Sequence, residues 1–190
     1  MNNLSLRLRV LLLALVPLIL LTGLLGWYNF AQMKQLGSQA VTSFSDDSMD
    51  NKHAELKNYV ELAVTSIAHL YNHPEAETNP QIQEEAWQIL RQLRFDDLGS
   101  PGYFFAYDKQ GVSRMHGVNQ ALEGKNLLNL QDPNGIYMIQ ELLAEAQKGG
   151  GYVHYSWENL ATKTIDPKLG YAVMLPKWEV FLGTGFWLVG

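Results

Sequence analysis

The sequence predicts an α+β fold, in which an N-terminal transmembrane helix and a long helix are followed by a five-stranded antiparallel sheet. Apolar residues recur at three- and four-residue steps over residues 31–72 and 82–93, which is the spacing of amphipathic helices. After residue 101 the pattern changes to short β-rich segments separated by turn residues, and strands with such short connections pair antiparallel. A chain of 190 residues accommodates one such domain and a small additional segment.

The apolar segment VLLLALVPLILLTGLLGW, residues 10–27, carries no charge. Such a run is long enough to cross a hydrocarbon core of roughly 30 Å. Arg7 and Arg9 precede it, so the positive-inside rule predicts a cytoplasmic N-terminus and export of the rest. A cleaved signal peptide is the alternative, but the run is longer than a signal core and no A-x-A-like site follows. We therefore predict a cytoplasmic N-terminus (1–9), an inner-membrane span (10–28), a membrane-proximal helix (29–44) and a periplasmic domain (45–190).

Two helices are predicted before the sheet. The first covers residues 31–72 and is ended by Pro74. The second begins at Asn79 and Pro80, because Asn is a good N-cap and Pro fits the first helical turn. The apolar stripe of the first helix consists of Leu56, Tyr59, Val60, Ala63, Ile67 and Leu70.

Five strands are predicted in the second half of the chain. They are GYFFAYD (102–108), VSRMH (112–116), YVHYSW (152–157), GYAVML (170–175) and EVFLGTGFWLV (179–189). A turn-rich loop and a short helix over residues 136–148 separate the second strand from the third. Helices followed by such a sheet have the outline of a PAS-like sensor domain.

Composition argues against several function classes. The net charge is −5 and no dense run of Lys or Arg occurs, so no nucleic-acid partner is expected. The absence of cysteine excludes disulfides, thiolate metal sites and Cys nucleophiles. His69 and His73 have a spacing that can hold a metal, but no third ligand follows at a suitable spacing. Without a G-x-S-x-G elbow or a phosphate loop, we predict no enzyme activity, no cofactor and no metal.

Several motifs in order resemble those of single Cache (sCache) domains, the extracytoplasmic sensor modules of bacterial chemoreceptors (methyl-accepting chemotaxis proteins) and sensor histidine kinases. These motifs include GYFFAYDKQG, LEGKNLLNLQDPNG, PKLGYAVMLPKW and GTGFW. The resemblance covers residues 45–189 and implies a PAS-like fold with a small carboxylate ligand, such as a two- or three-carbon acid or malate. One departure is ENLATK after YSW, where many members have a KPG turn. Many members also continue into acidic residues and a second membrane span after the last strand.

A carboxylate ligand requires fixed donors, ideally an Arg fork or a Lys together with hydroxyl or ring N–H groups. Alternation along a strand places Tyr103, Phe105 and Tyr107 on one face of GYFFAYD. Within the motifs that match the family, we expect Arg94 or Lys168 to be the charge partner. The expected hydrogen-bond donors are Tyr103, Tyr107, His116 and Tyr171, and the expected apolar walls are Phe105 and Trp157.

Most of these residues also have a structural alternative. Arg94 could cap the end of the second helix, where a cation is favourable. Phe105 and Trp157 could be core residues, since aromatic side chains dominate cores. His116 could be an exposed strand end, and Lys168, which follows a proline in a predicted loop, could be solvated. A register slip of one residue would exchange the two faces of any strand.

The sequence therefore predicts a membrane-anchored periplasmic sensor domain that binds a short-chain carboxylate and transmits the signal across the membrane, as in a chemotaxis receptor or a sensor kinase. A homodimer is expected, because a long helix next to the membrane pairs more readily than it stands alone. The alternative is an anchored periplasmic interaction or structural domain whose pocket is filled by its own side chains.

Overall fold

The computed structural model describes residues 15, 27, 49–97 and 100–188. Apart from positions 15 and 27, the predicted membrane span and membrane-proximal helix lie outside the described residues. Among the residues described, no helix is both long enough and apolar enough to cross a membrane. The chain divides into residues 1–50 and residues 51–190, and the second unit contains the sheet.

The first helical segment of this unit confirms the predicted apolar stripe. Residues 51–66 are helical, and after a turn at Ile67 the short helix α2 (Ala68–Tyr71) ends before Pro74. Four positions at three- and four-residue spacing are completely buried, namely Leu56, Val60, Ala63 and Ile67. Burial of such a stripe, rather than helix propensity, stabilises an amphipathic helix.

Helix α3 (Pro80–Gln92) begins where the sequence predicts. The side chain of Asn79 accepts a hydrogen bond from the Gln81 backbone N–H at 3.1 Å and so caps the first turn. The buried side of α3 carries Ile82, Ala86, Trp87 and Leu90. After α3 comes a small hairpin of β1 (Phe95–Asp97) and β2 (Ser100–Gly102), which was not predicted because three residues are too few to show a period.

The predicted five-stranded antiparallel sheet is confirmed. Its strands are β3 (Phe105–Asp108), β4 (Ser113–His116), β5 (Gly151–Asn159), β6 (Thr164–Leu175) and β7 (Val180–Trp187), in the order β4-β3-β7-β6-β5. Helix α4 (Met138–Gln147) lies between β4 and β5 in the chain, and the short helices η1 (Gln120–Leu122) and η2 (Pro176–Trp178) lie in connections.

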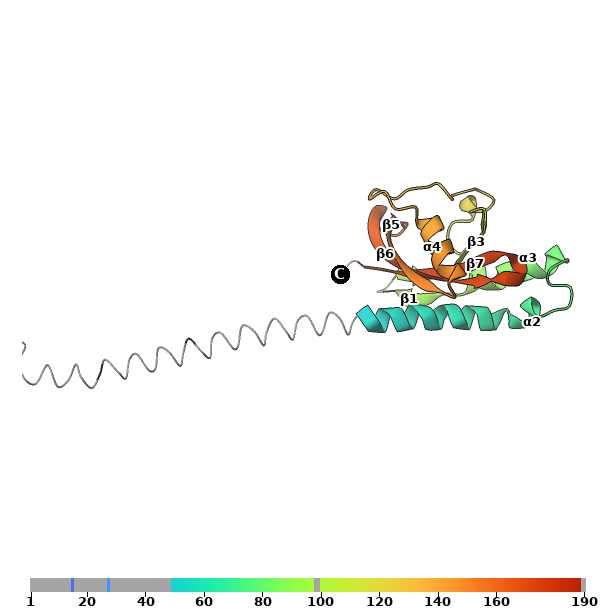
Figure 1. Ribbon diagram of the computed structural model, residues 1–190, viewed down its shortest axis with the longest axis horizontal. Coiled ribbons are helices and arrows are strands. Elements are labelled where there is room, and N and C mark those ends of the chain that lie inside the picture. Colours follow the sequence, from blue (N-terminus) through green and yellow to red (C-terminus); the bar gives the residue numbers. More distant parts are fainter. Residues whose placement is uncertain (1–14, 16–26, 28–48, 98–99, 189–190) are drawn as a thin grey trace, which may run out of the picture. The chain divides into compact units, whose positions relative to one another are not determined.

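The sheet is covered differently on its two faces (Figure 1). The helix over residues 51–66 runs along one face, while α4 lies on the other. The register places Phe105 opposite Gly183 and Tyr107 opposite Phe181, so these aromatic side chains share the α4 face. They belong to a buried cluster that includes Met138, Ile139, Leu142, Val153 and Tyr155. Tyr103, Phe105 and Tyr107 were predicted to share one face of the strand, and this face is the one that packs against α4.

Strand β6 begins at Thr164, six residues earlier than predicted, and this corrects the placement of Lys168 in a loop. The prediction was wrong because Pro167 reads as a strand breaker. The carbonyl of Pro167 accepts a hydrogen bond from the Leu188 backbone N–H at 2.9 Å. The imino nitrogen points to the same side, where β7 ends at Trp187, so the missing N–H costs no ladder bond.

Glycines in β7 make room for large side chains on the α4 face. A Cβ atom at Gly183 would lie 2.6 Å from Cε2 of Phe105 and 2.9 Å from the carbonyl oxygen of Tyr171. A Cβ atom at Gly185 would lie 2.9 Å from Cε of Lys168. The alternating glycines of the GTG motif therefore allow the Phe105 ring and the Lys168 stem to lie flat on the sheet.

Replacement of Gly183 by Ala is expected to lower the free energy of unfolding by about 1–3 kcal/mol, since an extra methyl group in a packed site forces its neighbours to move. Urea unfolding of the parent and the variant measures this change. In a Phe105→Leu background the same substitution should cost clearly less, because one of the two clashes is relieved. An equal cost in both backgrounds would show that Phe105 does not fill the space above Gly183.

Candidate ligand-binding site

A pocket of about 510 Å³ opens on the α4 side of the sheet. Tyr103, the end of β4 at His116, the loop before α4 and the β5–β6 connection all contribute to its lining. Its apolar lining includes Leu122, Leu130, Met138, Trp157, Ile165 and Trp187. A smaller apolar cavity of about 20 Å³ shares Tyr103, His116, Met138 and Trp157 with it and reaches toward the core.

The structure brings together six of the eight residues predicted for the site. Tyr103, His116 and Trp157 line both cavities, whereas Phe105 and Tyr107 line only the smaller one. Lys168 lies directly behind Tyr103 and Trp187, both of which line the larger pocket. The candidate site thus combines hydroxyl, imidazole and indole groups that line the pocket with the buried ammonium group of Lys168, which contacts two of the lining rings.

Lys168 is the central charged group of this arrangement. Only 1% of its surface is exposed, and it lies between Tyr155 and Trp187 across the strand ladders. Its Nζ donates a hydrogen bond to the Tyr103 hydroxyl at 3.0 Å and lies 4.1 Å from the Tyr103 ring centroid and 4.4 Å from that of Trp187. Burial lowers the pKa of Lys168 to about 7 by disfavouring the charged form.

The buried acid Asp97 interacts electrostatically with this lysine without forming a close ion pair with it. Asp97, the last residue of β1, is 3% exposed and accepts a hydrogen bond from the Trp187 backbone N–H at 3.0 Å. Burial raises the pKa of Asp97, although that hydrogen bond and the positive charge of Lys168 act in the opposite direction. Asp97 and Lys168 therefore interact electrostatically without forming an ion pair with each other.

Tyr103 and His116 are suited to donate hydrogen bonds at neutral pH. Burial raises the pKa of the Tyr103 phenol, so the hydroxyl keeps its proton. The carbonyl of Tyr103 accepts a hydrogen bond from the Thr184 hydroxyl at 2.6 Å, which fixes this residue on β7. Burial, helped by the charge of Lys168, lowers the pKa of His116 to about 4, so its ring is neutral. The Asn119 backbone N–H donates to its Nδ1 at 3.1 Å, which leaves the proton on Nε2.

Arg94, the other predicted charge partner, lies outside both cavities. It is exposed, and its guanidinium donates hydrogen bonds to the backbone carbonyls of Arg91, Leu93 and Gly117 at 2.6–2.7 Å. These contacts correspond to the alternative in which Arg94 caps the end of α3, and they also link α3 to the segment after β4.

Tyr171 lies on the opposite face of the sheet from the pocket. Along β6 the side chains alternate, so Tyr171 faces away from Lys168. Its ring lies 4.7 Å from that of Tyr152, which in turn lies 4.3 Å from His53 and donates a hydrogen bond to the His53 carbonyl at 2.7 Å. Tyr171 therefore packs where the helix over residues 51–66 meets the sheet edge.

Sequence reasoning missed two kinds of lining residue. Trp187 follows Gly183 and Gly185 at two-residue spacing, so alternation within GTGFW would have placed it on the same face. Asn119 and Asp132 lie in irregular loops and carry no such signal. Asp132 holds the loop before α4, because its carboxylate accepts hydrogen bonds from the backbone N–H groups of Asn134, Ile136 and Ser156 at 2.8–2.9 Å.

The model of the family described as single Cache domain 2 matches residues 48–188. The chain belongs to this family. It is thus a Cache chemosensory domain of the kind found in chemoreceptors and sensor histidine kinases.

Two relatives match this Cache domain over nearly its whole length. Sensor histidine kinase MctS of Rhizobium johnstonii is 34% identical over 188 residues, which are 97% of this chain and 39% of the kinase. Methyl-accepting chemotaxis protein CtpM of Pseudomonas aeruginosa is 31% identical over 191 residues, which are 100% of this chain and 33% of that protein. The chain therefore spans between a third and two fifths of the length of these relatives.

Solved structures support the same relationship. A methyl-accepting chemotaxis protein from Vibrio parahaemolyticus superimposes with a TM-score of 0.69 at 40% identity, covering 75% of this chain and 93% of that one. A Cache chemosensory domain solved to establish carboxylic acid recognition has a TM-score of 0.68 at 27% identity and covers 76% of this chain and 98% of its own. A periplasmic sensor domain of a chemotaxis protein has a TM-score of 0.67, also at 27% identity, and covers 74% and 98%.

Proposed function

We propose that this Cache domain binds a small carboxylate in the pocket between Tyr103, His116 and Trp157. The observation that carries the proposal is the buried Lys168, whose Nζ donates to the Tyr103 hydroxyl at 3.0 Å. A phenol that accepts a hydrogen bond from an ammonium group is polarised and donates its own proton more strongly to an anion. A ligand carboxylate at this wall would accept hydrogen bonds from Tyr103 and from the neutral His116 ring while being attracted by the charge behind them.

The composition of the lining favours an anion with an apolar body. Trp157, Trp187 and Met138 supply apolar surface close to Tyr103 and His116. The volume of about 510 Å³ exceeds that of a two- or three-carbon acid, so the donors rather than the volume would select the ligand. The solved Cache domain of known carboxylic acid recognition supports the same ligand class.

We further propose that the domain lies in the periplasm, anchored by residues 10–28 in the inner membrane, and acts as the sensor part of a dimeric receptor. The uncharged apolar run at residues 10–27 and the preceding Arg7 and Arg9 support the anchor. The relatives, which include a chemotaxis protein and a sensor kinase, support signalling as the output. Ligand binding can signal only through the part of its free energy that differs between two arrangements of the domain.

A thermal-shift screen of the full chain in detergent tests the ligand class. The compounds are acetate, propionate, pyruvate, lactate, malate, succinate, amino acids and polyamines. A ligand at about 100 times its dissociation constant adds roughly 2.7 kcal/mol to the stability, and we expect this with one or more short carboxylates. Shifts confined to amino acids or polyamines would overturn the ligand class. Absence of any shift would favour an interaction domain without a small ligand.

A further inference from the structure

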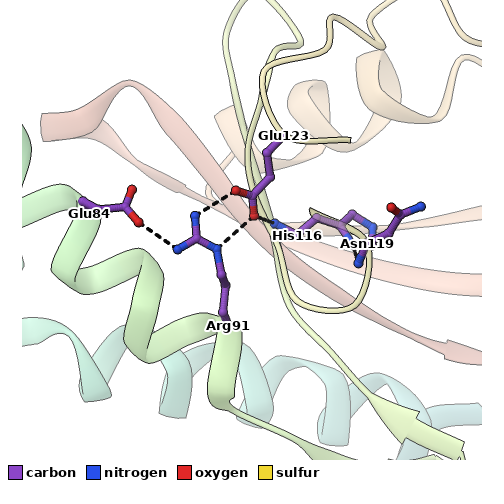
Figure 2. Close-up of polar contacts among 5 residues, drawn as sticks. All are labelled: Glu84, Arg91, His116, Asn119 and Glu123. Carbon is purple, nitrogen blue, oxygen red and sulfur yellow. Dashed lines mark hydrogen bonds and ion pairs between the residues drawn. The ribbon is translucent and has the colours of Figure 1, made fainter. Parts of the chain in front are cut away.

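The pocket wall formed by His116 and Asn119 belongs to a short segment that follows β4. The strand ends at His116, η1 covers Gln120–Leu122, and Glu123 folds back toward the strand end. Two hydrogen bonds close this segment on itself. The Asn119 backbone N–H donates to Nδ1 of His116 at 3.1 Å, and the His116 backbone N–H donates to Oε1 of Glu123 at 2.9 Å (Figure 2). Both the backbone and the ring of His116 are thus held by neighbours in this segment.

Glu123 connects the segment to α3. Nε of Arg91 donates to Oε1 of Glu123 at 2.9 Å, and Nη2 donates to Oε2 at 2.8 Å, which together form a two-bond fork (Figure 2). Such bidentate pairs fix geometry as well as adding energy. The side chains of Arg91 and Glu123 are only 17% and 21% exposed, so water screens this pair less than an ion pair on the open surface.

Arg91 has a second acidic partner, Glu84, which does not contact the segment after β4. Its Nη1 donates to Oε1 of Glu84 at 2.8 Å, but the Glu84 side chain is 52% exposed and lies on α3 itself. Glu84 therefore contacts the same guanidinium without touching the pocket wall. The two carboxylates form a natural pair of test and control positions.

We propose that Arg91 and Glu123 are positioning residues for ligand binding, which hold His116 and Asn119 at the pocket wall in the orientation that presents the Nε2 proton of His116. This inference rests on the proposed carboxylate-binding function of the pocket. Neither Arg91 nor Glu123 lines the pocket. They act through the backbone of His116, and they tie this wall to α3.

Glu123→Gln and Glu84→Gln in the full chain in detergent test the proposal, with acetate and propionate as separate probes in calorimetric titrations. In Glu123→Gln one carboxylate oxygen becomes an NH2 group that cannot accept from Arg91, so the fork is lost and binding should weaken at least about tenfold. Glu84→Gln should change it less than about twofold. Nitrogen NMR of ¹⁵N-histidine-labelled protein should show His116 protonated on Nε2 in the parent and in Glu84→Gln, and a mixture of tautomers in Glu123→Gln.

Equal binding by Glu123→Gln and the parent, with an unchanged His116 tautomer, would overturn the positioning role. If the Glu123→Gln protein fails to fold, Arg91→Lys replaces it, since this change keeps the positive charge but loses the fork. Arg91→Lys should then show the same mixture of tautomers, and an unchanged tautomer would contradict the proposal. If the parent binds neither acid, the proposed function fails, while the NMR comparison still decides whether Arg91 and Glu123 fix the His116 ring.

Discussion

Replacement of Lys168 by Met is expected to weaken carboxylate binding by this Cache domain strongly. The substitution keeps most of the side-chain volume but deletes the ammonium group that donates to the Tyr103 hydroxyl. A hydrogen bond to a charged group contributes about 1.5–3 kcal/mol, which corresponds to a loss of roughly 10- to 100-fold in affinity. Calorimetric titration with the acid that gives the largest thermal shift measures the loss.

Arg94→Met is the matched control for this experiment. It also deletes one positive charge, but the Arg94 guanidinium donates to the backbone carbonyls of Arg91, Leu93 and Gly117 and does not line the pocket. Its affinity should therefore stay within about twofold of that of the parent. Loss of binding in Arg94→Met with normal binding in Lys168→Met would exchange the roles of the two residues. Circular dichroism spectra should show that both variants are folded.

Carboxylate affinity is expected to decrease as the pH rises above about 7. The pKa of Lys168 in the ligand-free domain is about 7, and an anion binds best when this group is protonated. Ligand binding at higher pH must therefore be accompanied by proton uptake, and the dissociation constant should increase by up to about tenfold per pH unit. Titrations at pH 6, 7, 8 and 9, in buffers of different ionisation enthalpy, measure both effects. A dissociation constant that stays constant over this range would contradict a role for Lys168.

The stability of the ligand-free domain should change with pH in the opposite direction. The folded pKa of Lys168 lies below the ordinary value of 10.5, so the unfolded chain binds more protons between about pH 7 and 10.5. This group alone therefore makes the folded state more stable as the pH rises through that window, by up to about 1.4 kcal/mol per pH unit. His116, with a folded pKa of about 4, adds the same sign between pH 4 and 6.5.

The Tyr103→Phe variant distinguishes the contribution of the Tyr103 hydroxyl to binding from that of the Lys168 charge. The ring and its contact with Lys168 remain, so the pH dependence of affinity should persist while binding becomes weaker. A Tyr103→Phe variant without any pH dependence would mean that Lys168 acts only through the phenol. The groups near Lys168 that could add their own titration are Asp97, Tyr103 and His116.

Much of the fold could be predicted because its signals are local. The buried positions of the helix over residues 51–66 follow a short period, and Asn79 with Pro80 marks the start of α3. The alternation within GYFFAYD correctly placed Tyr103, Phe105 and Tyr107 on one side. These features depend on neighbours in the sequence, so a single chain suffices to predict them.

The site depends on relations between distant segments, and these were harder to predict. Lys168 is buried because β6 lies between β5 and β7 and because Gly185 leaves room for its aliphatic stem. Neither feature can be predicted from the residues that surround Pro167 in the sequence. Tyr171 lies on the other face because the register of β6 is set by its partners. The hydrogen bond from Arg94 to the Gly117 carbonyl depends on the position of Gly117 relative to the end of α3.

A crystal structure of the domain with its strongest-binding carboxylate would test the central claim most directly. We expect the ligand in the pocket beside Trp157, with a carboxylate oxygen about 3 Å from the Tyr103 hydroxyl or from Nζ of Lys168. The Nε2 atom of His116 should lie within hydrogen-bond distance of the same carboxylate. A ligand bound at Arg94 or on the Tyr171 face, with the pocket filled by the protein's own side chains, would contradict this assignment.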